Sequence, residues 1–453
     1  MAESVSRANA DAPELKLHAA GGRLPPGPRW PRFIVAIAYM TVGRRFMRVM
    51  NARFDGAFTL QLPLFGPTVT ITDPGLAKEL YQQPRDAVQG VDANLGMLLG
   101  PSSSFALQGE KHLRHRKILL PPFHGGRVRA YEQLIERETR NAIAGWPEDV
   151  EFAVLPTTMR ITLDTILRAI FGAEDKEFDD LRSLMPRIVE LGQRIIYLPW
   201  LRRDLGAWSP GHRFREMRAE LDRIMASLIA KALADPDLAQ RTDVLALLLQ
   251  SRYGDGTPMS HADITDELFT MVVAGHETTA TELAWAFERI RRHPDVLDRL
   301  VTEVDAGESA LLRATVAEVL RTRPVIDGSG RKVVAPSITL GQWTIPQGYT
   351  VAVNLSLTNH NPHTYDDPES FSPDRFVGTA PSTYSWLPFG GGNRRCLGAR
   401  FAQMEMEVVL RTILDEFELS PTKARPERLK PKGVVTMPGR GGLISVRRRK
   451  SVS

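Results

Sequence analysis

The stretch PFGGGNRRCLG, Pro388 to Gly398, contains the only cysteine in a chain of 453 residues. Four glycines and two arginines surround this residue, Cys396. Glycines permit a tight loop whose N–H groups can point at the sulfur, and they let the backbone approach a flat ring closely. A thiolate is a strong electron donor to haem iron, and Arg394 is suited to neutralise a haem propionate. The stretch therefore fits either an iron-ligating loop or a buried structural cysteine beside a flexible turn.

The composition favours a soluble globular protein with a large core. Apolar residues make up 43% of the chain and charged residues 25%. A single cysteine cannot form an internal disulfide, so we expect a reducing compartment and predict a cytoplasmic location. The 58 basic residues are interspersed with 53 acidic residues, which leaves a net charge of only +5. No zinc-finger, basic-zipper or RNA-binding signature is present. We expect no nucleic-acid partner.

No internal repeat or long linker divides the chain, so we predict one domain over residues 21–449. A disordered tail is expected at residues 1–20, and a solvated basic tail at residues 447–453. The longest early apolar run, FIVAIAYM at residues 33–40, is far shorter than the ~20 residues that cross a bilayer. We predict no transmembrane segment. The amphipathic helix expected there either docks on the protein's own core or touches a lipid surface.

The periodicity of apolar residues predicts a mainly α fold with small β-sheets. Alternation around Gly66-Pro67 predicts a hairpin at residues 58–73, helical spacing dominates residues 74–324, and strand-like segments return at residues 338–355 and 443–448. One helix is expected to run about 50 Å, from a cap at Ser260 to a stop at His293-Pro294.

The motif AGHETT, residues 274–279, lies in the middle of this long helix. A glycine in a helix interior costs roughly 1 kcal/mol relative to alanine, so Gly275 indicates a place of close approach to the backbone. A crossing helix would also account for it. We expect the Thr278 hydroxyl to bond the carbonyl of Ala274 and to open the helix beside Gly275 into a groove.

The cysteine stretch resembles the signature of the cytochrome P450 superfamily, F-x-x-G-x-R-x-C-x-G. Every specified position matches: Phe389, Gly392, Arg394, Cys396 and Gly398. The E-x-x-R motif of that family is present in EVLR as Glu318 and Arg321, and FSPDRF adds Arg375 as the third member of the family's Glu-Arg-Arg network. AGHETT resembles the family's oxygen-binding motif. The resemblance covers most of the chain.

This resemblance implies a single large triangular helical domain with a long central helix. It also implies haem b (iron protoporphyrin IX) with Cys396 as the metal ligand, and Glu277 and Thr278 as the catalytic acid–alcohol pair. His112 and Arg116, four apart on a helical face, and Arg331 match propionate-binding positions of the family. The full set of expected cofactor-binding residues is His112, Arg116, Ala274, Gly275, Arg331, Phe389, Gly390, Arg394, Cys396 and Gly398.

The resemblance further implies a monooxygenase of bacterial, in particular actinobacterial, style. It would insert one oxygen atom from O2 into a hydrophobic substrate such as a steroid, fatty acid, terpene or polyketide. No flavin or iron–sulfur sequence is present, so electrons from NAD(P)H are expected through a separate ferredoxin or flavodoxin-type donor and its reductase. A monomer is expected.

Two other functions stay open at this point, a peroxide-driven peroxygenase and a non-catalytic haem sensor. Family members that use peroxide typically lose the acid–alcohol pair, and a sensor would need a signalling domain or a second protein ligand to the iron. Lys111, Arg114, His115 and Lys117 are expected to point outward as a basic patch for an acidic electron donor. A solvated helix face is the alternative.

Overall fold

The predicted hairpin forms one end of the main sheet. In the computed structural model, which describes residues 23–450 except 63–64, 92–94, 124–130 and 173–175, β1 (Ala57–Leu62) pairs antiparallel with β2 (Gly66–Ile71). The sheet has the strand order β1-β2-β8-β5-β3. β2 is parallel to β8 (Thr350–Asn354), and β5 (Gly328–Val333) is antiparallel to both β8 and β3 (Val88–Gly90). Both ends of the chain therefore build one sheet.

The remaining strands form four two-stranded ribbons, which pair β10 with β11, β12 with β4, β13 with β9, and β6 with β7. Their bounds are β4 Phe152–Ala153, β6 Ser337–Leu340, β7 Trp343–Pro346, β9 Phe417–Leu419, β10 Leu429–Lys432, β11 Val435–Pro438, β12 Leu443–Ile444 and β13 Val446–Arg448.

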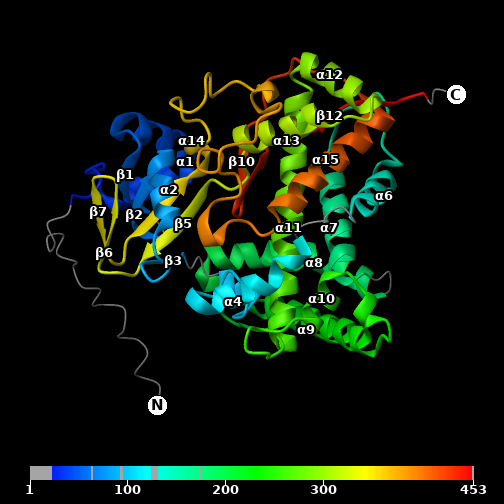
Figure 1. The fold of residues 1–453 in the computed structure, drawn as a ribbon, viewed down its shortest axis with the longest axis horizontal. Helices are drawn as coiled ribbons and strands as arrows, with labels where there is room; N and C mark the ends of the chain where they lie inside the picture. Colours follow the sequence, from blue (N-terminus) through cyan, green and yellow to red (C-terminus); the bar gives the residue numbers. More distant parts are fainter. Residues whose placement is uncertain (1–22, 63–64, 92–94, 124–130, 173–175, 451–453) are drawn as a thin grey trace.

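Helices make up most of the described chain. The α-helices are α1 Arg32–Phe54, α2 Pro74–Gln82, α3 Leu95–Leu99, α4 Gly109–Leu119, α6 Glu132–Ile143, α7 Leu155–Phe171, α8 Lys176–Tyr197, α9 Pro210–Ala234, α10 Val244–Gln250, α11 His261–Ile290, α12 Pro294–Asp305, α13 Ala310–Thr322, α14 Leu355–Thr358 and α15 Ala399–Glu416. In Figure 1 the sheet lies with α1 and α2 on one side of the molecule, and most of the longer helices lie on the other. A mainly α fold with small sheets is confirmed.

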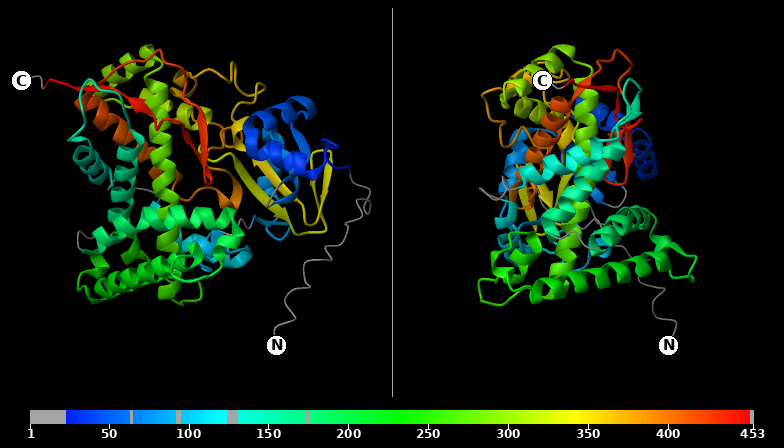
Figure 2. Two further views of the ribbon diagram at one scale, coloured as in Figure 1. Left: turned by 180° about the vertical axis from the view of Figure 1, so that it is seen from behind. Right: turned by 90° about the vertical axis from the view of Figure 1, so that its right-hand side faces the viewer.

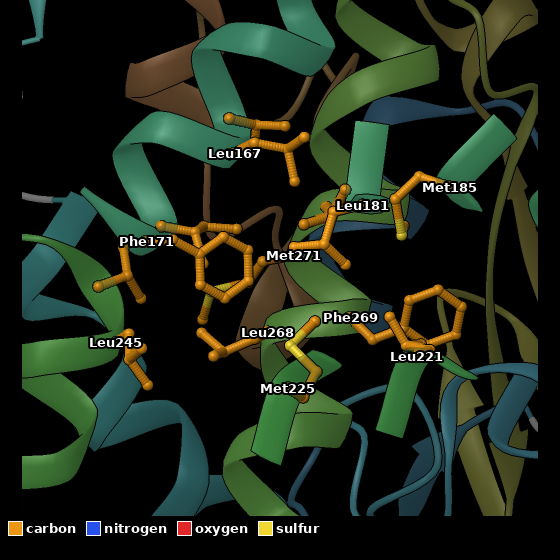
Figure 3. Packing of buried hydrophobic residues seen from close by; sticks show 14 of the residues in the cluster. Leu167, Phe171, Leu181, Met185, Leu221, Met225, Leu245, Leu268, Phe269 and Met271 are labelled. Carbon is orange, nitrogen blue, oxygen red and sulfur yellow. The ribbon is translucent and has the colours of Figure 1, made fainter. Parts of the chain in front are cut away.

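The long helix starts where its cap was predicted. The Ser260 side chain accepts a hydrogen bond from the N–H of Asp263, and α11 continues for 30 residues, about 45 Å. Most of α11 is buried. Figure 3 shows part of the core around it, where Leu268, Phe269 and Met271 pack among apolar side chains of α7, α8, α9 and α10. This packing fixes α11 as the central element of the helical region.

The predicted Glu-Arg-Arg network is present and buried. Arg321 donates two hydrogen bonds to the Glu318 carboxylate, at 2.7 and 2.8 Å, and both side chains are fully buried. Arg375 and the N–H of Ser372 bond the same carboxylate at 3.2 and 2.9 Å. Arg321 also donates to the carbonyls of Asn359, Pro368 and Ser370. The network therefore ties α13 to the irregular segment that precedes the cysteine loop.

Of the two predicted tails, only the C-terminal one can be compared with the structure, and it differs from expectation. The predicted tail at residues 1–20 lies outside the described residues. The basic C-terminal stretch is not a free tail, because β13 pairs with β9, and Arg447, Arg448 and Arg449 form ion pairs with Asp149, Glu416 and Asp305. Within the described part of the chain, no helix has the length and apolar character needed to cross a membrane.

Candidate functional site

The cysteine loop leads directly into α15. The N–H of Cys396 bonds the carbonyl of Phe389 at 2.9 Å, which closes the loop on itself. Gly398, the residue before α15, donates its N–H toward the Cys396 sulfur and lowers the pKa of the thiol, whereas burial raises it more strongly. The predicted N–H contact to the sulfur is therefore present, and it comes from the start of a helix, where unpaired N–H groups gather.

Two glycines of the loop are required by its neighbours. A Cβ at Gly391 would lie 2.3 Å from the ring of Tyr81, a residue of α2. Gly392 has a φ of +65°, a conformation that other residues rarely adopt. Arg331, on β5, donates to the carbonyl of Gly391 at 2.7 Å and lies over the Tyr81 ring. The main sheet and α2 therefore hold the loop from one side.

Three arginines and one histidine among the predicted residues form a cluster beside this loop. Burial, followed by the charges of Arg394, Arg116 and Arg331, lowers the pKa of His112 to about 3. Burial, Arg331 and Arg116 lower the pKa of Arg394 to about 10. Arg116 donates to the carbonyl of Arg395 at 2.7 Å and is close enough to Cys396 to interact electrostatically.

These cations lack anionic partners. Among the described residues, none of the three arginines forms an ion pair with a carboxylate; Arg394 instead donates to the carbonyls of Ser104 and Leu107 and to the amide oxygen of Gln108. Arg331 is buried, and Arg116 and Arg394 are partly buried. Cations withdrawn from water are ordinarily paired, because burial without a partner disfavours the charged form. The cluster is therefore suited to receive a ligand that carries carboxylates.

The surroundings of the thiol fit a flat cofactor. The Cys396 residue is exposed by surface area, yet it is surrounded closely enough for burial to raise the pKa of the thiol. Both observations agree if its accessible surface faces a hollow within the protein. A Cβ at Gly398 would meet no heavy atom within 4 Å. A thiol that faces open space beside unpaired cations fits a haem. The sulfur would coordinate the haem iron, and the arginines would pair with the haem propionates.

The predicted hydrogen bond in α11 is present, but the predicted opening of the helix is not. The Thr278 hydroxyl donates to the carbonyl of Ala274 at 2.7 Å. The helix nevertheless continues through Gly275, whose added Cβ would lie 3.4 Å from Ile166 of α7. Gly275 therefore faces a crossing helix. Ala274 is exposed although the residues around it on α11 are buried or half-buried, so its surface marks a hollow beside α11.

Glu277 is held by two residues that the sequence analysis missed. The amide of Gln193, on α8, donates to one carboxylate oxygen at 2.7 Å, and the Lys432 ammonium lies 2.9 Å from the other. Lys432 ends β10, and a Cβ at the next residue, Gly433, would clash with the Gln193 amide at 2.6 Å. No local sequence signal connects these residues, because they lie 84 and 155 positions from Glu277.

On the basic helix α4, the prediction of four outward-pointing basic residues is wrong for His115. His115 does not point outward: it is buried, with Nε2 2.7 Å from the Tyr253 hydroxyl and Nδ1 3.4 Å from Glu267. Arg114 is exposed but pairs with Asp255, which neutralises it. Lys111 and Lys117 are exposed as expected. The outward basic patch is therefore reduced to two lysines.

The predicted residues belong to two groups on different elements. His112, Arg116, Arg331, Arg394 and the loop from Phe389 to Gly398 form the first group, and the residues of α11 from Ala274 to Thr278 form the second. Leu397, directly after Cys396, packs against the same apolar core as Met271 and Val272, directly before the second group. A shared core therefore fixes the two groups relative to each other.

Comparison with known proteins decides the family. The model of the family described as Cytochrome P450 matches residues 25–445. The chain belongs to the cytochrome P450 family. It is 46% identical over 427 residues to cytochrome P450 138 of Mycobacterium tuberculosis, covering 94% of this chain and 97% of that protein. It is also 40% identical over 447 residues to cytochrome P450 135B1 of the same organism, covering 95% and 93%.

Solved structures agree with the fold of this cytochrome P450. The retinoic acid-bound cyanobacterial CYP120A1 matches with a TM-score of 0.81 and 22% identity, covering 94% of this chain and all of that one. The haem domain of cytochrome P450DA also matches with a TM-score of 0.81, at 21% identity. The predicted P450 fold and the bacterial resemblance are confirmed, and the chain is a haem-thiolate monooxygenase, an oxidoreductase.

Proposed function

We propose that this cytochrome P450 inserts one oxygen atom from O2 into a hydrophobic small molecule, with electrons from NAD(P)H delivered by separate proteins. The cluster of three arginines and His112 beside Cys396 is the observation that carries the proposal, because haem propionates would explain why arginines gather where the described residues supply no carboxylate partner. A haem b bound there through the Cys396 thiolate would supply the activation of oxygen.

The cysteine loop and the basic residues beside it would hold the haem in this proposal. Cys396 would ligate the haem iron, and the N–H of Gly398 would stabilise negative charge on the sulfur. Arg394, Arg331, Arg116 and His112 bind the two propionates. Once a propionate lies beside His112, the desolvated ring gains an anionic partner, which favours its protonated form.

The α11 residues handle protons. The Thr278 hydroxyl is fixed by the carbonyl of Ala274, so its oxygen is oriented to accept a hydrogen bond from a water in the hollow beside Ala274. Glu277 lies about 100° further round the helix, so it exchanges protons with that water rather than with the Thr278 hydroxyl directly. The presence of this pair favours use of O2 over peroxide alone.

The first experiment tests the ligand and the reaction class. Cys396→Ala should abolish the strongly red-shifted Soret band of the reduced carbon monoxide complex, and a pyridine haemochrome assay should identify haem b in the wild type. Turnover with NADPH, ferredoxin and reductase should exceed turnover with hydrogen peroxide alone. A retained red-shifted band in the variant would refute the ligand assignment, because the chain has no second cysteine.

The exposed lysines of α4 are the proposed contact for an acidic electron donor. Reversing Lys111 and Lys117 to glutamate should slow reduction by an acidic ferredoxin and weaken its dependence on salt, while substrate affinity stays the same. Arg114→Gln is the control on the same helix, because Asp255 already neutralises that charge. Unchanged reduction kinetics in the double variant would place the donor elsewhere.

A further inference from the structure

The acidic residues of the chain are distributed unevenly. Residues 15–54 contain eight of the 58 basic residues and none of the 53 acidic residues. The other 413 residues therefore hold 50 basic and 53 acidic residues, a net charge of −3. The positive net charge of the whole protein comes from one segment, and most of that segment is the proline-rich stretch from Arg23 and the helix α1.

The first half of α1 presents an apolar stripe to solvent. Phe33, Ile37 and Met40 are 65, 58 and 76% exposed, and they recur at helical spacing on one face. Ile34 and Trp30 extend the stripe, at 41 and 46% exposed. Exposed apolar residues are ordinary when scattered, but a continuous stripe of large side chains marks an interaction surface.

The second half of α1 fixes this stripe in place. Phe46, Met47 and Met50 are buried against β1, and Arg44 pairs with Asp327 at 2.6 Å. Backbone angles at Val42 are not helical, so the helix bends between its docked half and its exposed half. Figure 2 shows α1, in blue, at the periphery of the molecule. The exposed half is therefore presented outward on a rigid base.

The arginines around the stripe are available for an anionic partner. Of the seven arginines from Arg23 to Phe54, only Arg44 and Arg48 form ion pairs with carboxylates among the described residues. Arg29, Arg32 and Arg45 are exposed. A second copy of the chain docked on the same face would bring these arginines close to one another, which charge repulsion opposes.

We propose that the stripe of α1 and its flanking arginines bind the surface of an anionic lipid bilayer. The apolar side chains enter the headgroup boundary, Trp30 lies at the interface, and the arginines contact anionic headgroups. In this arrangement α1 lies along the membrane surface rather than across the bilayer. This surface is independent of the proposed roles of the catalytic residues.

Sedimentation of the full-length holoprotein with lipid vesicles tests the proposal. Vesicles made of equal parts phosphatidylglycerol and phosphatidylcholine should bind the protein, and pure phosphatidylcholine vesicles should bind it far more weakly. Raising the salt from about 0.1 to about 1 M shortens the Debye length from roughly 10 to 3 Å and should release most of the protein. Replacing Arg29, Arg32 and Arg45 by glutamine should weaken binding by about fivefold per arginine.

A matched pair of variants separates the stripe from general surface effects. Ile37→Glu should abolish vesicle binding, whereas Leu233→Glu, at a site 49% exposed on α9, should not. Both variants should keep the wild-type carbon monoxide spectrum. Three results would overturn the proposal: no binding to anionic vesicles, equal losses in the two variants, or a solution dimer that Ile37→Glu dissociates.

Discussion

Glu405 lies in the middle of α15, nine residues after Cys396, and its side chain is buried. Neither carboxylate oxygen has a hydrogen-bond partner in the described part of the chain, and burial raises the pKa of the group well above its ordinary value of 4.5. Glu318 is equally buried but fully bonded. At the residue scale, the carboxylate of Glu318 is therefore stabilised by its hydrogen bonds, whereas burial favours the protonated form of Glu405.

Glu405→Gln should therefore change how stability depends on pH. Because the folded-state pKa is raised, the wild type is stabilised below pH 4.5 and loses that stabilisation as pH rises toward the folded pKa. Glutamine cannot ionise, so the stability of the variant relative to the wild type should rise by about 1.4 kcal/mol per pH unit between pH 4.5 and the folded pKa, and then level off. Urea unfolding at several pH values measures this slope, and parallel curves for the two proteins would show that Glu405 finds a partner.

Thr278→Ala tests the proposed role of the Thr278 hydroxyl in proton delivery. Haem content, the carbon monoxide spectrum and substrate affinity should stay near wild type, because the hydroxyl bonds only the helix carbonyl of Ala274. Product formed per NADPH should fall several-fold, and hydrogen peroxide should rise, because the water beside Ala274 loses its partner. Thr279→Ala is the control, since that neighbouring side chain is buried. Tight coupling in Thr278→Ala would remove the residue from the proposed proton path.

At the scale of elements, α8, α11 and the turn between β10 and β11 meet at Glu277. Gln193 and Lys432 each bond one oxygen of this carboxylate, and Gly433 permits the close approach of the turn to α8. A movement of either element would leave one oxygen without its partner. The position of the proposed acid therefore depends on two elements that are distant from it in sequence.

Lys432→Met should slow oxygen-dependent turnover by roughly tenfold, the equivalent of about 1.4 kcal/mol, because Glu277 loses its cationic partner. Lys432→Arg should restore most of the rate. Lys430 lies on the same strand and forms no ion pair among the described residues, so Lys430→Met removes the same charge and should leave the rate unchanged. Equal effects of Lys430→Met and Lys432→Met would assign the loss to the overall charge of the strand.

Local signals predicted the elements well. The alternation around Gly66 predicted the hairpin, and the Ser260 cap predicted the start of α11, because both depend on residues close in sequence. His115 was placed wrongly because its partners, Tyr253 and Glu267, lie 138 and 152 positions away. The contacts of Glu277 were missed for the same reason. Helical spacing shows which residues share a face, but not which distant element covers that face.

At the scale of the whole molecule, the Glu318 network joins helical and irregular parts of the chain. Arg321 reaches three carbonyls between residues 359 and 370, and Glu318 holds Ser372 and Arg375. The Glu318 and Arg321 motif was predicted from sequence. The contacts of Arg321 with backbone carbonyls were not, because every residue has a carbonyl group and the sequence does not show which of them will be bonded. The network fixes the path of the chain toward the cysteine loop.

Glu318→Ala should destabilise the protein by about 3–5 kcal/mol, because it leaves Arg321 buried without its charge partner. The thermal midpoint and the haem content of the purified protein measure the effect, and both should fall. Asp374→Ala is a control in the same segment: it removes the exposed pair with Arg299 and should cost at most about 1 kcal/mol. Similar losses in the two variants would show that the buried network contributes no more than a surface pair.

The parallel pairing of β2 with β8 affects how the sheet can form while the chain is being synthesised. Val69 and Ile71 pair with Val351 and Val353, so some 280 residues must be synthesised between the two strands. At about 5–20 residues per second, the ribosome takes roughly 14–56 seconds to supply the missing neighbour. Throughout that interval the newly made hairpin has an open, β-branched edge. Until β8 is made, that open edge can pair with another nascent chain, so delayed completion of the sheet should favour aggregation.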